Sequence, residues 1–319
     1  MFHIYSYDDA KIFHGKLVQC WFLRKIKGGK TKKNGYSCKD TTCLVCNSKI
    51  HMQTDLPSKL KVFLLKDDNI EKLVSGVPKE LLSLVGNFEQ IKFSKRDQKK
   101  IRSFFINTGY ENWFQENYSK VFLDKLNLDT CTYCNRNYTL NLIDSRTRAE
   151  LDHWFPKEKY PILSLSFFNL IPSCHSCNHI KGSPNINWKE ALDNYIHPYI
   201  IEKHETFKFG FNYDLSLNDY KVEIEVKNGS KIEKTVVANS LKEIYSSNAS
   251  KELKDLVDLR YKYSDNYIDI LINKTFKGLM TEEEIYRLVF NIEIDEKKYH
   301  QRPFSKFKHD VIEELKKIK

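Results

Sequence analysis

Cys131-Thr-Tyr-Cys134 and Cys174-His-Ser-Cys177 frame the most informative segment of this sequence. The two Cys-x2-Cys pairs are separated by 39 residues, a spacing typical of four thiolates that hold one zinc ion. Each pair forms a tight turn, and the two turns meet at one tetrahedral ion when a hairpin folds between them. The alternative is a pair of redox dithiols, but no thioredoxin-like βαβ pattern surrounds either pair. The four cysteines therefore predict a structural zinc site.

Length and composition exclude several classes of protein. The 319 residues are 41% hydrophobic and 13% aromatic, which is ordinary for a globular protein with one large domain or two to three small ones. The amino terminus has no basic segment followed by an apolar one, and no run approaches the roughly 18 apolar residues of a membrane span. Eight cysteines without a secretory signal fit a reducing compartment, so we expect a cytoplasmic protein that does not contact the membrane.

The net charge of +10 favours polyanionic partners such as nucleic acid. Basic side chains are concentrated in two segments, residues 24–33 and residues 92–102. The first segment holds no acidic residue, and the second holds only Asp97. Each is either a phosphate-binding patch or a solvated surface, and the sequence leaves this choice open.

The pattern along the chain predicts an α+β protein in four segments. Residues 1–60 form a small segment rich in cysteine and lysine, and residues 61–128 have the apolar spacing of helices. Residues 129–190 contain the zinc-binding module. Residues 191–319 combine strand and helix patterns in a C-terminal extension, which is a candidate partner-binding region.

Within the zinc-binding module we expect a hairpin followed by a helix. Residues 138–143 alternate as one strand, and residues 149–155 return as the second strand until a proline ends it. Tyr160-Pro161 and an irregular apolar segment that ends at Pro172 then lead to a short helix, which Ser173 caps and Gly182 ends. In the preceding helical region, Ser94 is the predicted N-cap of a helix over residues 95–107, and a second helix is predicted over residues 111–126.

The C-terminal extension begins with a second predicted hairpin. Residues 222–226 alternate as a strand, Asn228-Gly229 supplies a turn, and residues 232–237 return as the second strand. Helices follow, and Thr281 with Glu284 forms a capping box before one of them.

The N-terminal segment contains a third cysteine pair, Cys43-Leu-Val-Cys46. A second zinc site would need two more ligands, and Cys38 with either Cys20 or His51 can supply them. The spacing of these cysteines is irregular, so the alternative interpretation is that they are ordinary thiols.

The central module also carries side chains suited to phosphodiester hydrolysis. His153 supplies an imidazole, the group best suited to take a proton near pH 7. Asp152 and Asn178 supply hard oxygen ligands for a divalent cation such as Mg²⁺. Neighbouring strand residues project to opposite sides, so Asp152 and His153 can have separate roles.

Helix geometry favours Asn178 over the nearby histidines. Steps of about 100° place Asn178 and Lys181 on the side of the helix that carries the two cysteines. His175 and His179 fall outside that arc and are expected at the surface. Lys181, one turn beyond Asn178, is a candidate phosphate contact.

These motifs resemble the zinc-bearing branch of the HNH, or ββα-metal, endonucleases. The motifs that carry the resemblance are Cys131-x2-Cys134, Leu151-Asp-His-Trp-Phe-Pro156 and Asn169-Leu-Ile-Pro-Ser-Cys174-x2-Cys177-Asn178-x2-Lys181. The resemblance implies that His153 is the general base and that Asn169 braces the loop that carries it. It also implies that Asp152 and Asn178 hold a catalytic Mg²⁺ or Mn²⁺. Asn178 stands where the family pattern has histidine, a departure that many members share.

Within this family, the sequence is similar to the HNH subunits of Septu-type and retron-linked anti-phage systems. The similarity rests on residues 152–157, on Tyr160-Pro161, on residues 169–174 and on residues 302–310. It implies an effector nuclease that works with an ATPase partner.

The predicted function is therefore a metal-dependent endonuclease that acts on nucleic acid, with DNA as the first expectation. Arg136 and Arg148, which flank the predicted hairpin, are further candidate contacts to the nucleic-acid backbone. One alternative is an RNase, such as a tRNA-cleaving enzyme, that uses the same site. Another is a zinc-stabilised nucleic-acid-binding or scaffold protein without catalytic turnover.

Overall fold

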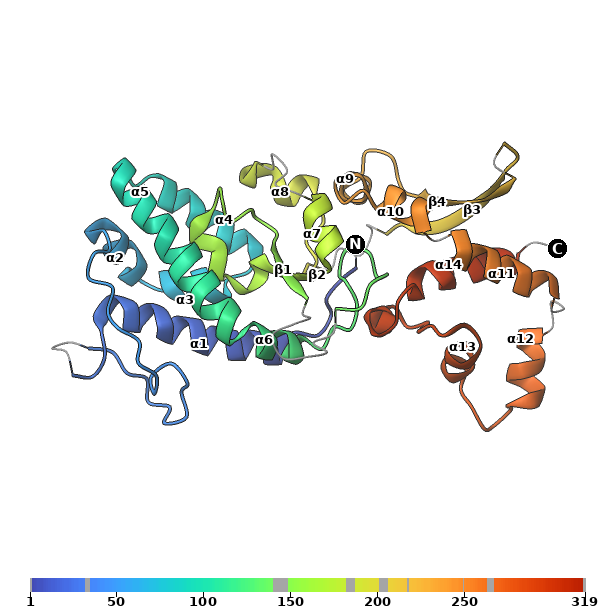
Figure 1. Cartoon of the computed structure of the whole chain (residues 1–319), viewed down its shortest axis with the longest axis horizontal. Coiled ribbons are helices and arrows are strands. Elements are labelled where there is room, and N and C mark those ends of the chain that lie inside the picture. Colours follow the sequence, from blue (N-terminus) through green and yellow to red (C-terminus); the bar gives the residue numbers. More distant parts are fainter. Residues whose placement is uncertain are drawn as a thin grey trace.

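The fold is α+β, as the sequence predicted. The computed structural model describes residues 2–31, 35–139, 149–181, 187–200, 206–216, 218–248, 250–262 and 267–317. Across these residues the chain forms helices and two small antiparallel sheets. Figure 1 shows an elongated molecule with the N-terminal helices and the central module at one end and the C-terminal extension at the other. Within the described ranges, no helix has the length and apolar character needed to cross a lipid bilayer.

The N-terminal end of the molecule is organised around one long helix, α1 (Asp8–Lys27). It packs against α3 (Asn69–Ser75) and α6 (Ser119–Leu126). Trp21 of α1 is fully buried and stacks on Phe104 with ring centroids 5.2 Å apart. Buried aromatic area of this kind stabilises the helical layer. The remaining helices of this end are α2 (Ser58–Leu65), α4 (Pro78–Glu89) and α5 (Lys95–Arg102).

The N-cap predicted at Ser94 is confirmed, because its side chain accepts a hydrogen bond from the backbone in the first turn of α5. The gap predicted between the two helices of this region is wrong. They are joined through a π-helix, η1 (Ser103–Gln115), and the interruption falls later, at Tyr118. Gly109 does not end the helix. A Cβ there would lie 2.8 Å from Leu165, so the glycine permits close packing instead.

The central module has the order strand, strand, helix. The strand β1 (Glu150–His153) pairs antiparallel with β2 (Leu170–Ser173), and α7 (His175–Lys181) follows. The expectation of an irregular apolar segment that ends at Pro172 is wrong, because two short 3-10 helices and then β2 form there. All four residues of β2 are buried, so they show no alternation, and Pro172 among them disguises the strand further. Of the first predicted strand, residues 140–143 lie outside the described residues, and so does Gly182, the predicted helix end.

The first Cys-x2-Cys turn is held by segments that are distant in the sequence. The backbone amide of Phe2 donates to the carbonyl of Thr132 at 2.9 Å, and the Tyr245 hydroxyl donates to the carbonyl of Cys134 at 2.7 Å. Asn135, buried directly after the turn, donates to two carbonyls of the C-terminal extension at 2.8 and 3.2 Å. The N-terminus and the C-terminal extension therefore both pack on this turn.

In the C-terminal extension the second sheet differs from the predicted hairpin. The strand β4 (Asp219–Glu225) pairs with β3 (Lys208–Asp214), and the second predicted strand is instead the helix α9 (Lys231–Ala238). Gly229 has a φ of 75°, and the Ser230 side chain accepts a hydrogen bond from the third residue of α9. The Asn-Gly pair therefore turns the chain into a capped helix and not into a strand.

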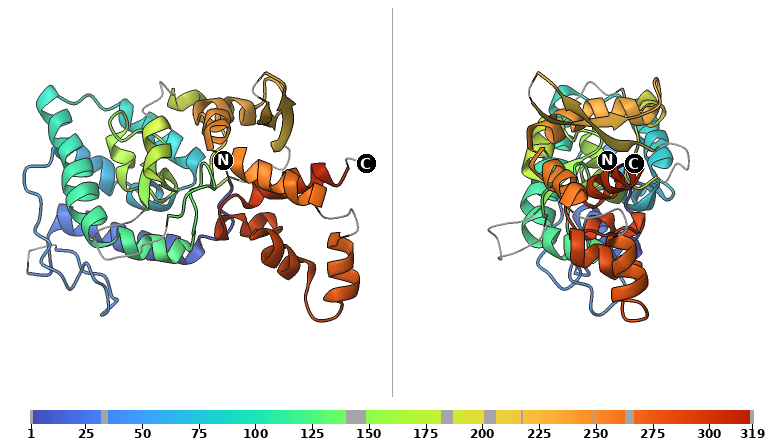
Figure 2. Two further views of the ribbon diagram at one scale, coloured as in Figure 1. Left: turned by 45° about the vertical axis from the view of Figure 1, so that its right-hand side comes forward. Right: turned by 90° about the vertical axis from the view of Figure 1, so that its right-hand side faces the viewer.

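The remaining elements of the described residues are helices. They are η2 (Pro161–Leu165), η3 (Phe167–Asn169), α8 (Trp188–Asn194), α10 (Leu241–Asn248), α11 (Ser250–Lys262), α12 (Tyr267–Ile270), η4 (Leu271–Thr275), α13 (Glu282–Phe290), η5 (Glu296–Gln301) and α14 (Ser305–Leu315). The capping box predicted before α13 is confirmed. Helices α11 and α14 pack against the β3–β4 sheet (Figure 2). Buried residues from all four predicted segments join one hydrophobic core, and the boundaries of these segments stay a prediction.

Candidate functional site

The four cysteines of the central module lie together, and we call them the central tetrad: Cys131, Cys134, Cys174 and Cys177. Their sulfur atoms all lie within 4.8 Å of one another. All four are free thiols; three are buried and Cys174 is half-buried. The Asn137 side-chain amide donates to the sulfur of Cys174 at 3.3 Å, and the Arg136 amide donates to that of Cys134 at 3.4 Å. The central tetrad can therefore bind zinc.

A polar pocket of about 480 Å³ opens beside the β1–α7 contact. It is lined by Tyr110, Gln115, Glu150, Leu151, Asp152, His153, Pro156, Lys157, Glu158, Asn178 and His179. Three of the predicted site residues, Asp152, His153 and Asn178, thus face one cavity. His179, which helix geometry had set aside, lines it as well.

His153 is buried at the end of β1 in a single orientation. Its Nε2 lies 3.1 Å from the carbonyl oxygen of Ser164, and its ring meets the ring of Tyr110 edge-on at 4.4 Å. A carbonyl only accepts hydrogen bonds, so Nε2 carries the proton and Nδ1 keeps an unprotonated lone pair. Burial lowers the pKa of His153 to about 4. The imidazole is therefore neutral near pH 7.

Asn169 lies outside the pocket and connects the segments that surround it. Its side-chain amide donates to the carbonyls of Phe155 at 3.1 Å and Leu163 at 3.0 Å, and its oxygen accepts from the Phe155 amide at 2.6 Å. Its backbone carbonyl also accepts from Trp154 at 3.0 Å. The side chain is fully buried. Asn169 therefore holds the segment that follows His153.

Asp152 is a buried carboxylate with two donors on one oxygen. Its Oδ2 accepts from the Lys181 ammonium at 2.5 Å and from the Tyr133 hydroxyl. Burial raises the pKa of Tyr133, so the hydroxyl keeps its proton and donates. Lys181 has a side chain only 6% exposed, so its ammonium neutralises this carboxylate inside the protein. Its role as a phosphate contact stays a prediction.

Glu150 is a site residue that sequence reasoning missed. Its carboxylate accepts from the Asn178 side-chain amide at 2.6 Å and pairs with His175 at 2.6 Å. Partial burial acts to raise the pKa of Glu150, but these two hydrogen bonds bring it below its ordinary value. Strand alternation could have found it, because Glu150 and Asp152 are two residues apart and share a face of β1. Glu150 orients the amide of Asn178.

The candidate arginines lie away from the pocket or outside the described residues. Arg136 donates to the carbonyl of Ile244 at 3.0 Å and packs over the rings of Tyr245 and Phe304. In the structure it joins the central module to the C-terminal extension. Arg148 lies outside the described residues.

The N-terminal cysteines form a second cluster, which we call the N-terminal tetrad: Cys20, Cys38, Cys43 and Cys46. Their sulfurs also lie within 4.8 Å of one another, so this group can bind zinc too. Of the two predicted candidates for its fourth position, the structure brings in Cys20 and leaves His51 exposed outside the group.

Fold and site together define an α+β protein built around a strand–strand–helix unit that carries a cysteine tetrad and a histidine pocket. Among curated proteins, the chain is similar to Septu protein PtuB of Bacillus thuringiensis, with 30% identity over 125 residues. The similarity covers 39% of this chain and 45% of that protein. No family model matches the sequence, and no solved structure matches it. The resemblance to HNH endonucleases therefore stays a prediction.

Proposed function

We propose that this chain is a metal-dependent endonuclease of the HNH type that hydrolyses phosphodiester bonds, with DNA as the expected substrate. The observation that carries the proposal is the orientation of His153 in one pocket with Asp152 and Asn178. The similarity to Septu protein PtuB supports a role in anti-phage defence. From the resemblance to the HNH subunits of such systems, we propose that an ATPase partner works with the nuclease.

His153 is the proposed general base. Because its Nε2 proton is donated to the carbonyl of Ser164, Nδ1 is the nitrogen that accepts a proton from the attacking water. As the water oxygen bonds to phosphorus, its proton moves to Nδ1 and the bond to the leaving 3′ oxygen breaks. The leaving oxygen then takes a proton from solvent. Asn169 keeps the segment after His153 in place during this step.

The donor set fits a hard divalent cation, Mg²⁺ or Mn²⁺. Asp152 offers a carboxylate, and Asn178 offers an amide oxygen, because its nitrogen is directed to Glu150. A cation held there supplies Lewis-acid stabilisation of charge on the phosphate. Lys181 compensates the buried charge of Asp152, which otherwise would be costly to keep inside the protein.

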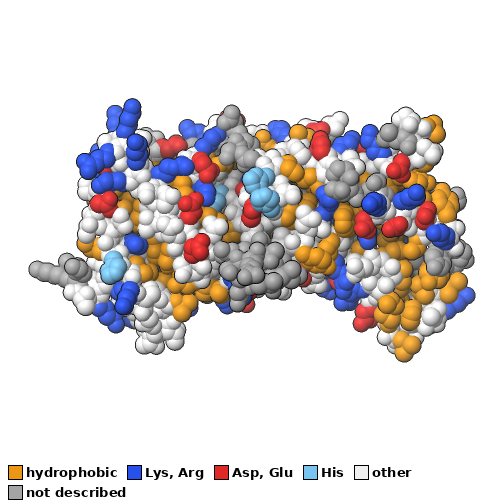
Figure 3. All heavy atoms as spheres, in the orientation of Figure 1, with side chains coloured by type: hydrophobic (Ala, Val, Ile, Leu, Met, Phe, Trp, Pro, Cys, Tyr) orange, Lys and Arg blue, Asp and Glu red, His pale blue; other side chains and the backbone are white. Residues whose placement is uncertain are grey.

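A basic surface next to the pocket supports nucleic acid as the substrate. The exposed basic residues of α5 are Lys95, Arg96, Lys99 and Arg102. Figure 3 shows Lys and Arg side chains gathered at the end of the molecule where α5 lies. The guanidinium of Arg102 donates to the carbonyl of Glu158, a residue of the pocket wall, at 2.9 Å. A phosphate backbone bound along α5 would therefore approach the pocket.

The direct test is plasmid nicking in the presence of Mg²⁺, with and without EDTA. We expect His153→Ala to lower the cleavage rate by about 10²- to 10⁴-fold, the range for loss of a general base, with unchanged zinc content. His51→Ala, which changes an exposed histidine outside the pocket, should cleave like the wild type. Cleavage by His153→Ala at the wild-type rate would contradict the assignment.

The substrate is tested by offering duplex DNA, single-stranded DNA and tRNA to the chain, alone and with the product of its genomic neighbour. Cleavage of DNA supports the proposal. Cleavage of tRNA alone would identify an RNase that uses the same residues. Binding without cleavage under every condition would favour the non-catalytic, zinc-stabilised alternative.

A further inference from the structure

The N-terminal tetrad unites one helix with a long connecting segment. Cys20 lies on α1 and is buried, whereas the other three cysteines lie on the connection between α1 and α2 and are half-buried. Four thiolates about 2.3 Å from a tetrahedral zinc lie about 3.8 Å from one another, and the observed sulfurs lie within 4.8 Å of one another. The side chains thus already stand at nearly the required separation.

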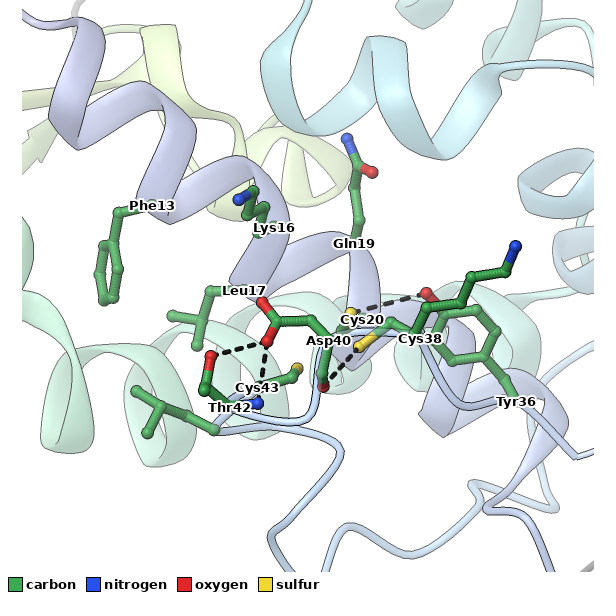
Figure 4. Close-up of a pocket in the computed structure, with 12 residues that line it drawn as sticks. Phe13, Lys16, Leu17, Gln19, Cys20, Tyr36, Cys38, Asp40, Thr42 and Cys43 are labelled. Carbon is green, nitrogen blue, oxygen red and sulfur yellow. Dashed lines mark hydrogen bonds between the residues drawn. The ribbon is translucent and has the colours of Figure 1, made fainter.

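Backbone amides donate to two of these sulfurs, as they would to thiolates. The amide of Cys38 donates to the sulfur of Cys46, and the amide of Cys46 donates to the sulfur of Cys43, both at 3.4 Å. The hydroxyl of Tyr36 lies 3.6 Å from the sulfur of Cys20. Figure 4 shows Cys20, Cys38 and Cys43 at the wall of a pocket between α1 and the connecting segment. Donors directed at sulfur stabilise its negative charge.

Outside the tetrad, the described part of the connecting segment is held by buried side chains such as Val45 and by hydrogen bonds to the end of α1. Its described parts, residues 28–31 and 35–57, form no helix or strand. A connection of this length without regular structure is uncommon in a compact domain, because ordering it costs conformational entropy. At the end of α1, the Gln53 backbone amide donates to the Lys25 carbonyl at 2.8 Å, and the Arg24 guanidinium donates to the Ser48 carbonyl at 3.3 Å.

We propose that the N-terminal tetrad binds a second Zn²⁺, and that this ion fastens residues 35–57 to α1. Four thiolates favour a soft or borderline cation. Zn²⁺ has no geometric preference of its own and accepts their tetrahedral arrangement, as it does in structural zinc sites. Zinc binding displaces the thiol protons, and its binding free energy becomes folding free energy for the segment. This site is independent of the proposed nuclease pocket, so each proposal can fail without the other.

The test is the zinc content of the purified full-length chain, measured by mass spectrometry of the metal. We expect two zinc ions per chain in the wild type and one in Cys43→Ser/Cys46→Ser. His51→Ala, which changes the rejected fourth ligand, should keep two. A single zinc in the wild type, or two in the double-serine variant, would overturn the proposal, and the four residues would then be ordinary thiols.

A second measurement covers the case in which the double-serine variant does not fold. The wild-type chain, with zinc replaced by ¹¹³Cd, should give two cadmium resonances in the range of four-sulfur coordination. One resonance only, from the central tetrad, would equally overturn the proposal. The cadmium spectrum needs no variant, so the result does not depend on how the substitutions are tolerated.

Discussion

The central tetrad and the N-terminal tetrad offer the same four thiols in different surroundings. Three cysteines of the central tetrad are buried, and Phe2 and Tyr245 bind its first turn from distant parts of the chain. In the N-terminal tetrad only Cys20 is buried, and the other ligands lie on a connection without helix or strand in its described part. The same four thiols therefore occupy different places: the central tetrad lies at a junction of distant parts of the molecule, and the N-terminal tetrad lies at one peripheral segment.

The largest effect is expected when the central tetrad is broken. Cys134→Ser should abolish cooperative unfolding and cleavage together, because a structural zinc contributes an apparent binding free energy of about 10–16 kcal/mol to the folded state. Circular dichroism during heating and plasmid nicking measure the two losses. If the variant unfolds at the wild-type temperature, the central tetrad is not the junction that we infer.

Breaking the N-terminal tetrad should have a smaller and local effect. In Cys43→Ser/Cys46→Ser, we expect residues 35–57 to exchange amide hydrogens at least about tenfold faster, while the nuclease pocket keeps its activity. Hydrogen exchange read by mass spectrometry locates the change. If amide exchange in residues 35–57 is unchanged, or if the variant loses cleavage together with its second zinc, the two tetrads do not differ as we infer.

Asn169 holds a segment without any metal, by hydrogen bonds alone. Asn169→Ala leaves three buried backbone groups without their partner, so we expect a loss of about 3 kcal/mol in the free energy of unfolding. Asn187→Ala is the matched control, because it removes an exposed helix cap and should cost about 1 kcal/mol or less. Urea titration measures the free energy of unfolding of both variants. Equal losses would show that Asn169 does not hold its segment more strongly than an exposed helix cap does.

The smallest difference between the tetrads should appear in kinetics. A chelator such as EDTA reaches half-buried thiolates more readily than buried ones, so zinc should leave in two phases. A colorimetric zinc indicator follows the release. We expect the fast phase to be absent in Cys43→Ser/Cys46→Ser. A fast phase that persists in this variant would assign the labile ion to the central tetrad.

Sequence reasoning succeeded where a local pattern carries the information. The regular spacing of the central cysteines foretold that their sulfurs would meet, and Ser94 marked a helix start through its own hydrogen bond. The sequence could not decide between Cys20 and His51 as the fourth member of the N-terminal tetrad. Cys20 reaches the connecting segment only because of the way α1 packs.

Other features depended on the tertiary environment. The strand Leu170–Ser173 is buried on all sides, so no periodicity betrays it. The Asn-Gly pair before Ser230 is compatible with a hairpin and with a helix start. The N-cap hydrogen bond accepted by Ser230 favours the helix. Lys181 carries a charge that a sequence assigns to the surface, yet the buried carboxylate of Asp152 draws it inward.

The central claim is that His153 acts on water while Asp152 and Asn178 hold a cation. We would measure Mn²⁺ binding by electron paramagnetic resonance and plasmid nicking on the same zinc-loaded samples of wild type, His153→Ala and Asp152→Ala. The account predicts that His153→Ala binds Mn²⁺ like the wild type but cleaves about 10²- to 10⁴-fold more slowly, and that Asp152→Ala loses both binding and cleavage. Cleavage by His153→Ala at the wild-type rate, or wild-type Mn²⁺ binding by Asp152→Ala, would contradict it.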